Sequence, residues 1–187
     1  MMTYAERNRR ILYGLDPIVT DRVEKALRVL DMLGYDVLLT DGRRTEEEQN
    51  ELFMKGRTEE GEIVTYVKGK ESFHVWGVAF DLVPVLFGFL QWKNIPKYEQ
   101  IAKILTGLGF SWGYQMWGFD YGHFQYTQGL TIEDFIAGKS LHEEPDNEFH
   151  ILEPDTKPHK RFVARLSVVC ARLGILLITK AKNVLWP

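Results

Sequence analysis

The chain has 187 residues, 45% hydrophobic and 26% charged, which is the composition of a folded globular protein with an ordinary core. Its single cysteine, Cys170, excludes an internal disulfide and a cysteine-built zinc site, so any metal ligands must be His, Asp or Glu. Residues 1–156 hold 16 Lys and Arg against 26 Asp and Glu, a net charge of −10, so we expect no nucleic-acid partner.

The N-terminal part predicts no export signal, one helix and one strand. The first residues carry charges and tyrosines where a secretory leader needs an unbroken apolar stretch, so synthesis in a bacterial or host cytoplasm without a signal peptide is expected. Thr20 followed by VEKALRVLDMLG predicts a helix, because apolar residues recur at helical spacing and Gly34 suits a left-handed stop. YDVLLT, residues 35–40, predicts a buried strand.

A second helix is predicted from Thr45 to Gly56, because Thr45 and Glu48 stand in capping-box spacing. Arg44 therefore lies at a strand-to-helix junction, where it could clamp a substrate carboxylate or polarise a carbonyl. An arginine in a charged loop is more often simply solvated. The segment 57–71 mixes Gly, Glu and Lys around IVTYV, which predicts a loop with a short extended piece.

Two further strands and a helix are predicted in the middle of the chain. AFDLV, residues 79–83, alternates enough to be a strand and is expected to stop at Pro84. Pro96 fits the first turn of a helix that continues through IAKILTGLG to a cap at Gly109. HFQY, residues 123–126, predicts a short strand.

The last part of the chain separates into pieces of different composition. Thr131 and Asp134 in capping-box spacing predict a short helix that ends at Gly138. The sequence then becomes acidic and proline-containing without a period, so we place a domain boundary near residue 142. The expected organisation is a folded domain over 1–142, an acidic linker over 143–158 and a basic, apolar segment over 159–187.

The segment 161–187 is apolar on nearly all sides of a helical wheel and contains no acid. Arg172 and Lys180 leave seven uncharged residues between them, well short of the roughly 18 that a simple transmembrane span requires. Two alternatives stay open for this segment. It could lie on an anionic membrane surface, or it could dock on the preceding domain or on another subunit.

Four side chains, His74, Asp81, Asp120 and His123, could together form a metal centre. A catalytic zinc needs three N or O ligands from the protein and one open position for water, and two histidines with one aspartate would serve. Asp81 carries most weight, because in a strand it would share a face with apolar neighbours and an unpaired buried carboxylate is costly. A cation offsets that cost, and an ion pair with Arg44 is the alternative to a metal.

The neighbouring polar residues have plainer explanations as well. Asp120 stands three residues before His123, where its carboxylate could act as general base. Ser72 could hydrogen-bond a ligand or substrate, although its spacing alone fits the start of a turn. A histidine in an apolar stretch, such as His74, is more often a hydrogen-bonded core residue than a ligand.

The motifs around these residues resemble a known family. SFHVWGVAFD, residues 72–81, matches the S-x-H-x-x-G-x-A-x-D signature of the zinc D-alanyl-D-alanine carboxypeptidases and L-alanyl-D-glutamate endopeptidases, and DYGH, residues 120–123, matches their later acid-x-x-histidine. From about residue 15 to residue 141 the chain is most similar to the bacteriophage endolysin and bacillar cell-wall endopeptidase branch. Supporting motifs are GRRT with Gln49 downstream, GRT and GEIVT within 56–65, GFSWG at 109–113 and HFQYTQGLT at 123–131.

This resemblance implies one zinc ion held by His74, Asp81 and His123, with Asp120 as general base and Arg44 in contact with substrate. It also implies a small α+β domain whose antiparallel sheet carries the zinc site and is flanked by helices. The implied substrate is the stem peptide of bacterial peptidoglycan, cut at the L-alanyl-D-glutamate bond by a phage-type lysis enzyme acting at the cell wall. A D-alanyl-D-alanine carboxypeptidase and a non-catalytic murein-binding or virion structural component are the alternatives.

Two departures from the family pattern bear on these expectations. Gly122 stands where the family usually has proline before its last histidine, which could loosen the base. Residues 112–117 read WGYQMW where the family has Trp-Gly-Gly-Asp-Trp, which alters a pocket wall. The resemblance therefore determines zinc binding more firmly than it determines the bond that is cut.

Overall fold

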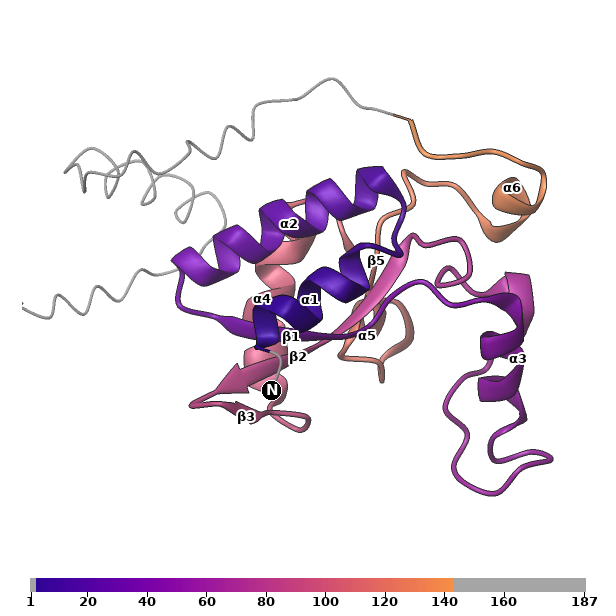
Figure 1. Ribbon diagram of the computed structural model, residues 1–187, viewed down its shortest axis with the longest axis horizontal. Helices are drawn as coiled ribbons and strands as arrows, with labels where there is room; N and C mark the ends of the chain where they lie inside the picture. The colour runs from indigo at the N-terminus through magenta and orange to yellow at the C-terminus, as the bar shows by residue number, and fades with distance from the viewer. Residues whose placement is uncertain (1–2, 143–187) are drawn as a thin grey trace, which may run out of the picture. The chain divides into compact units, whose positions relative to one another are not determined.

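The computed structural model describes residues 3–142, so the linker and the C-terminal segment predicted above lie outside the described residues. Figure 1 shows the order of the elements along the chain. The helices are α1 (Tyr4–Leu12), α2 (Pro17–Met32), α3 (Glu46–Met54), α4 (Ile95–Gly107), α5 (Gly113–Trp117) and α6 (Ile132–Ile136), with a 3₁₀ turn η1 (Gly69–Glu71). The strands are β1 (Asp36–Asp41), β2 (Ala79–Leu86), β3 (Phe89–Leu90), β4 (Ser111–Trp112) and β5 (His123–Gln125).

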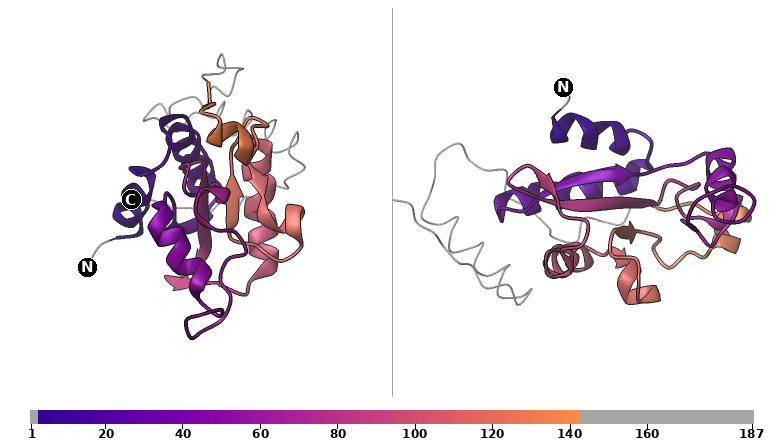
Figure 2. Two further views of the ribbon diagram at one scale, coloured as in Figure 1. Left: turned by 90° about the vertical axis from the view of Figure 1, so that its right-hand side faces the viewer. Right: turned by 90° about the horizontal axis from the view of Figure 1, so that it is seen from below.

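A small antiparallel sheet forms the middle of the domain. Its strands follow the order β1-β2-β5-β4, and β3 pairs with the far end of β2. Helix α1 lies on one side of the sheet and α4 and α5 lie on the other (Figure 2), while α2 contacts both β1 and α4. The expected α+β class, with helices flanking an antiparallel sheet, is therefore confirmed.

The register between β2 and β5 positions the later site. Phe80 pairs with Phe124, and Asp81 pairs with His123. The two phenylalanine rings stack with centroids 5.9 Å apart and have no exposed surface, so each contributes about 1.5–3 kcal/mol through burial. Because side chains alternate across a strand, the aromatic pair anchors one face of the sheet and leaves the aspartate and histidine side by side on the other.

Helix α1 protects the free edge of the sheet through one buried side chain. The Asn8 side-chain Nδ2 donates to Val37 O (3.1 Å), and its Oδ1 accepts from Leu39 N (2.8 Å). The asparagine thus bonds two backbone groups that a neighbouring strand would otherwise pair with, which hinders another chain from joining this edge. Val37 faces Pro84 in the register, and since its carbonyl goes to Asn8, the missing N–H of the proline costs no ladder bond at that pair.

Asn8→Ala is expected to destabilise the domain by about 1–3 kcal/mol, because it leaves a buried carbonyl and a buried N–H of β1 without partners. Urea unfolding followed by circular dichroism measures the change. Arg10→Ala, at an exposed position of the same helix, is the matched control and should change the free energy of unfolding by less than about 0.5 kcal/mol. Equal stability of the two variants would contradict the edge-pairing role.

Several predicted boundaries need correction. Helix α2 begins at Pro17 under an Asp16 cap, three residues before the Thr20 start that apolar spacing suggested. Strand β2 continues through Pro84 to Leu86 for the reason given above. Within the described residues, 57–71 is a loop that ends in the 3₁₀ turn η1, and no paired strand forms in it. The short elements α1, α5, β3 and β4 were not predicted.

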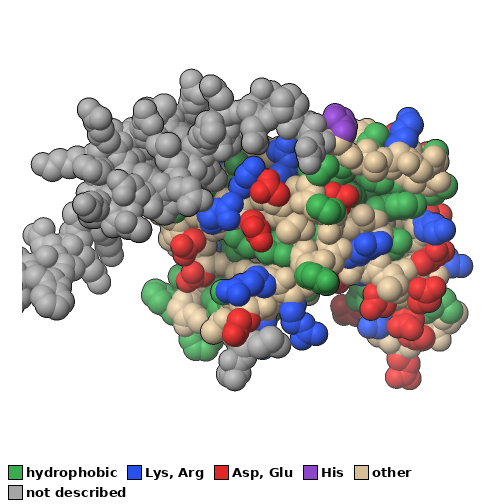
Figure 3. All heavy atoms as spheres, turned by 45° about the horizontal axis from the view of Figure 1, so that its top comes forward, with side chains coloured by type: hydrophobic (Ala, Val, Ile, Leu, Met, Phe, Trp, Pro, Cys, Tyr) green, Lys and Arg blue, Asp and Glu red, His purple; other side chains and the backbone are tan. Residues whose placement is uncertain are grey.

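The surface near α3 is strongly acidic. Figure 3 shows acidic side chains crowded over this end of the domain. Such a surface repels phosphate groups, in line with the expectation of no nucleic-acid partner, which stays a prediction. Within residues 3–142, no helix has both the length and the apolarity needed to cross a bilayer. The glutamates of α3 and the following loop are Glu46, Glu47, Glu48, Glu51, Glu59, Glu60 and Glu62.

Candidate metal centre

Three sequence-predicted ligands come together from three separate segments. His74 lies in the turn after η1, and a backbone bond from Arg44 N to His74 O (3.1 Å) holds this turn beside the end of β1. Asp81 lies on β2 and His123 lies on β5, as register partners. The sheet therefore fixes two of the three side chains, and the turn brings the third to them.

The atoms of these side chains that could bind a metal lie close to one another. The distance from His74 Nε2 to His123 Nδ1 is 3.2 Å. Asp81 Oδ1 lies 3.2 Å from His123 Nδ1 and 3.5 Å from His74 Nε2. The two histidines are only 4% and 6% exposed. His74, Asp81 and His123 form the group within the described residues that could hold a metal ion.

The outer nitrogen of each imidazole is tied to an oxygen that can only accept. His74 Nδ1 donates to Gly42 O (2.7 Å), and His123 Nε2 donates to Gln125 Oε1 (3.2 Å). Each ring therefore carries its proton on the outer nitrogen and turns a lone pair toward the carboxylate. Three acceptors then converge with no donor among them, an arrangement that a cation stabilises, so the residues fit a zinc ion.

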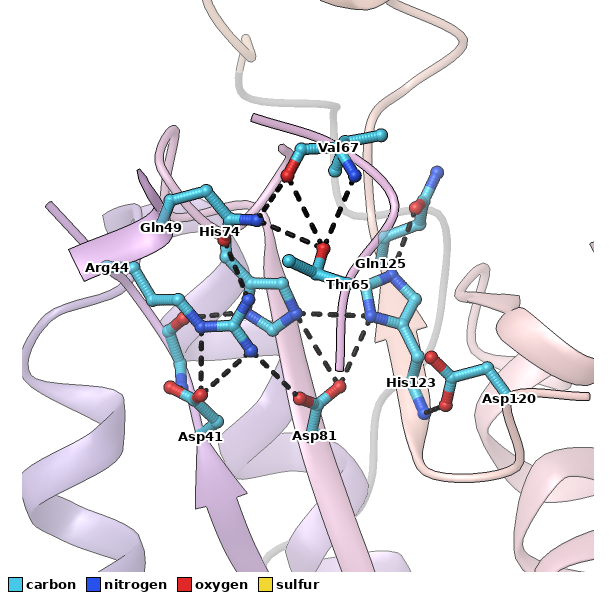
Figure 4. A network of polar contacts seen from close by, with 11 residues as sticks. Asp41, Arg44, Gln49, Thr65, Val67, His74, Asp81, Asp120, His123 and Gln125 are labelled. Atoms are coloured by element: carbon cyan, nitrogen blue, oxygen red, sulfur yellow. Dashed lines mark hydrogen bonds and ion pairs between the residues drawn. The ribbon is translucent and has the colours of Figure 1, made fainter. Parts of the chain in front are cut away.

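Arg44 explains how the partly buried carboxylate of Asp81 is balanced. Its Nη2 lies 3.4 Å from Asp81 Oδ2 and 2.8 Å from Asp41 Oδ2 (Figure 4). The two oxygens of Asp81 are therefore divided, with Oδ1 toward the imidazoles and Oδ2 toward the guanidinium. The ion pair considered above as an alternative to a metal is present, and it leaves Oδ1 in place to act as a ligand.

The charges of the centre shift one another. Burial by itself raises the pKa of Asp81, but the facing imidazoles of His74 and His123 outweigh it and hold that pKa well below its usual range. Burial lowers the pKa of His123, but the neighbouring Asp81 carboxylate outweighs it and raises that pKa, because it would accept the extra proton of the charged ring and attracts its positive charge. The Asp81 carboxylate therefore stays ionised, as a metal ligand must.

Asp120 lies beside the three ligands without belonging to their group. Its Oδ1 accepts a hydrogen bond from His123 N (3.1 Å), which orients the carboxylate at the turn before β5. Burial and the negative charge of Asp81 raise the pKa of Asp120, although His123 partly offsets them. The position predicted for a general base is thus at the edge of the metal group. Gly122, in place of the family's proline, still ties this turn to β2, because its carbonyl accepts from Leu82 N (3.0 Å).

An open cleft of about 780 Å³ lies over the centre. Arg44, Asp120 and the buried Ser72 all line it, so the structure places these predicted residues where a substrate could reach them. One wall is the segment 63–67, hereafter the cleft wall. Trp117 also lines the cleft and packs against the ring of His123 with centroids 5.1 Å apart.

Three residues whose roles were not predicted from the sequence contact the metal ligands, Arg44 or Asp120. Gln125 accepts from His123, and Gln49 accepts from Arg44 Nη1 (2.9 Å). At Gly113, a Cβ atom would come within 2.8 Å of Asp120 O and 2.9 Å of His123 Cβ. GFSWG and Gln49 were noted only as family motifs, and nothing in their spacing indicated these contacts.

Gly113→Ala is expected to lower zinc affinity by roughly 10–100-fold, because the added methyl group pushes the Asp120–His123 turn away from Asp81. Zinc affinity is measured by competition with a chromophoric chelator. Ser111→Ala, an exposed position on the neighbouring strand, serves as control and should bind zinc like the unmodified protein. Unchanged affinity in Gly113→Ala would show that the turn can move without cost.

The chain is similar in sequence and in fold to known peptidases. A family model described as D-alanyl-D-alanine carboxypeptidase matches residues 66–126. The peptidoglycan L-alanyl-D-glutamate endopeptidase CwlK of Bacillus subtilis (strain 168) is 34% identical over 121 residues, covering 59% of this chain and 72% of that protein. The solved L-Ala D-Glu endopeptidase ChiX of Serratia marcescens shares the fold, with a TM-score of 0.50, 24% identity and coverage of 69% of this chain and 90% of that one.

Proposed function

Because this chain belongs to the zinc D-alanyl-D-alanine carboxypeptidase and L-alanyl-D-glutamate endopeptidase family, we propose that it cuts the stem peptide of bacterial peptidoglycan at the L-alanyl-D-glutamate bond. It is a metallopeptidase whose cofactor is zinc. The observation that carries the proposal is the convergence of His74, Asp81 and His123 with Asp120 at their edge, on the floor of an open cleft. The Bacillus subtilis relative, an L-alanyl-D-glutamate endopeptidase, supports the choice of bond.

The metal would be held by His74 Nε2, Asp81 Oδ1 and His123 Nδ1. Zinc bound there supplies a water whose pKa is lowered to about 7 and polarises the scissile carbonyl. The ligands themselves stay fixed, because Gly42 and Gln125 hold the imidazoles and Arg44 holds the second oxygen of Asp81. Little reorganisation is then required during the reaction.

Asp120 would move the proton. Its carboxylate takes the proton from the attacking water and passes it to the amine that leaves as the peptide bond breaks. The hydrogen bond that the backbone N–H of His123 donates to Asp120 Oδ1 keeps this carboxylate beside the metal group throughout. A purely murein-binding protein would need no such group, so the position of Asp120 supports catalysis over the non-catalytic alternative.

The charge of the cleft favours an internal bond over a terminal one. A carboxypeptidase must pair the terminal carboxylate of its substrate with a cation, and Arg44 is the only Lys or Arg among the described residues that line the cleft. Its guanidinium already contacts Asp41, Gln49 and Asp81, which leaves at most one of its five N–H groups, on Nη1, for a substrate carboxylate. This occupancy supports cleavage within the stem peptide.

Mass spectrometry of purified murein, incubated with zinc-loaded protein and with a chelator control, tests the proposal. New L-alanine carboxyl termini paired with D-glutamate amino termini are expected, and they should be missing from the control. Release of D-alanine alone would establish the carboxypeptidase instead, and murein binding without new termini would establish a binding protein. A phage-type lysis role at the cell wall stays a prediction from the motifs, and contact of 161–187 with a membrane or subunit lies outside the described residues.

A further inference from the structure

One buried amide joins the metal centre to the cleft wall. Gln49, on α3, has no exposed surface, and its side chain is hydrogen-bonded at both ends (Figure 4). Its Oε1 accepts from Arg44 Nη1 (2.9 Å), while its Nε2 donates to Val67 O (2.9 Å) and to Thr65 Oγ1 (3.1 Å). The amide has one orientation only, because a flip would set its NH₂ group against the guanidinium and its oxygen against a carbonyl.

The cleft wall has few other attachments that could set its position. It forms no strand within the described residues, so no ladder of backbone bonds holds it. Arg57 donates to Thr65 O (3.1 Å), and the exposed ring of Tyr66 meets Phe119 edge-on, with ring centroids 5.9 Å apart. Gln49 is the buried contact among these, and buried hydrogen bonds cost most when they are broken. Ile63 and Val64 are exposed apolar side chains of the same wall.

The other end of the amide acts on the metal ligands. Arg44 gives Nε and Nη2 to Asp41 (2.9 and 2.8 Å), Nη2 also to Asp81, and Nη1 to Gln49. A planar guanidinium bonded on three sides cannot rotate freely, so its distance to Asp81 Oδ2 is set. Gln49 bonds both the cleft wall and Arg44, and Arg44 in turn bonds Asp81. The positions of the cleft wall and of this carboxylate ligand are therefore linked through Arg44.

We propose that Gln49 is a positioning residue for peptide binding, which acts through Thr65, Val67 and Arg44 and touches neither substrate nor metal. It holds the cleft wall at a fixed distance from the ligands, so that a stem peptide lying in the cleft against this wall presents its bond to the centre. This inference rests on the proposed function for the identity of the peptide. The geometric part, that one amide fixes the wall, stands without it.

Gln49→Met tests the inference, since methionine fills a similar volume without hydrogen bonds. KM for a soluble stem peptide is expected to rise about tenfold while kcat stays within about twofold, the signature of lost substrate binding. Zinc content should not change, because the three ligands remain. Hydrogen exchange in 63–67 should accelerate at the Val67 amide, since its acceptor Thr65 Oγ1 has lost the bond from Gln49. Thr65→Val removes only one of the two wall bonds and should give a smaller rise in KM.

Leu30→Ala is the control for general loss of stability. It opens a cavity under α2, away from the cleft, and should leave both KM and exchange in 63–67 as in the unmodified protein. Unchanged exchange and unchanged KM in Gln49→Met would overturn the inference, as would a fall in kcat at constant KM. The exchange measurement requires no substrate, so it decides the role of Gln49 even if the murein assay shows a different bond or no cleavage.

Discussion

His74→Ala is expected to abolish zinc binding and, with it, peptidase activity. The substitution removes one of only three protein ligands, and the remaining Asp81 and His123 cannot form a site of the catalytic type. The water in the site then returns toward its ordinary pKa, so activity should fall on the order of 10³-fold or more. The fold should persist, because His74 lies in a turn and contributes no strand pairing.

Zinc per chain is measured by mass spectrometry of the metal after dialysis, and activity by release of new murein termini. His142→Ala is the matched control: only the backbone of His142 contacts Gln128, and its ring is outside the metal group. This control should keep one zinc per chain and full activity. Stoichiometric zinc together with full activity in His74→Ala would rule out the proposed ligand set.

Asp120→Asn is expected to separate metal binding from catalysis. Asparagine keeps an oxygen that can accept from His123 N, so the turn and the ligand stay in place and zinc should be retained. The amide cannot take a proton from water, so kcat should fall by roughly 10²–10⁴-fold, the usual contribution of general acid–base catalysis.

The matched control for this substitution is Glu71→Gln, which neutralises another carboxylate lining the same cleft. It should change kcat by less than about threefold, since Glu71 is outside the metal group. Both variants are assayed for zinc content and for kcat on the same murein. Loss of zinc in Asp120→Asn would make Asp120 a ligand, and near-normal kcat would remove it from the mechanism.

The fold was predictable where apolar periodicity or capping signals were strong. The predicted capping boxes at Thr45 and Thr131 are both present, and each opens a helix. Helix α1 was missed because only one of its two buried residues, Leu12, is apolar: the other, Asn8, pairs with the backbone of β1, so no apolar stripe marks the helix. Pro84 was wrongly expected to end its strand. Strand β2 continues through it because the carbonyl of its register partner, Val37, is bonded to Asn8 instead.

Arg44 shows the limit of sequence interpretation at the site itself. Its place at a strand-to-helix junction allowed a free substrate clamp, a solvated arginine or an ion pair with Asp81. The structure shows an arginine held between Asp41, Asp81 and Gln49 that still lines the cleft. Those contacts join residues up to 37 positions apart, so no local pattern could have distinguished the alternatives.

The sequence alone determined which chemical groups are available to the site. The two pairs, His74 with Asp81 and Asp120 with His123, and the spacing within each pair can be read directly from the chain. Only the tertiary structure decided which atom of each group faces the centre. Gly42 and Gln125 bond the outer nitrogens of the two imidazoles, and Arg44 bonds the second oxygen of Asp81. These contacts form only because β2 pairs with β5 and because the turn that carries His74 lies beside β1. Hydrogen-bond partners from separate segments choose the tautomer and the carboxylate oxygen, and that choice exists only once the segments have packed.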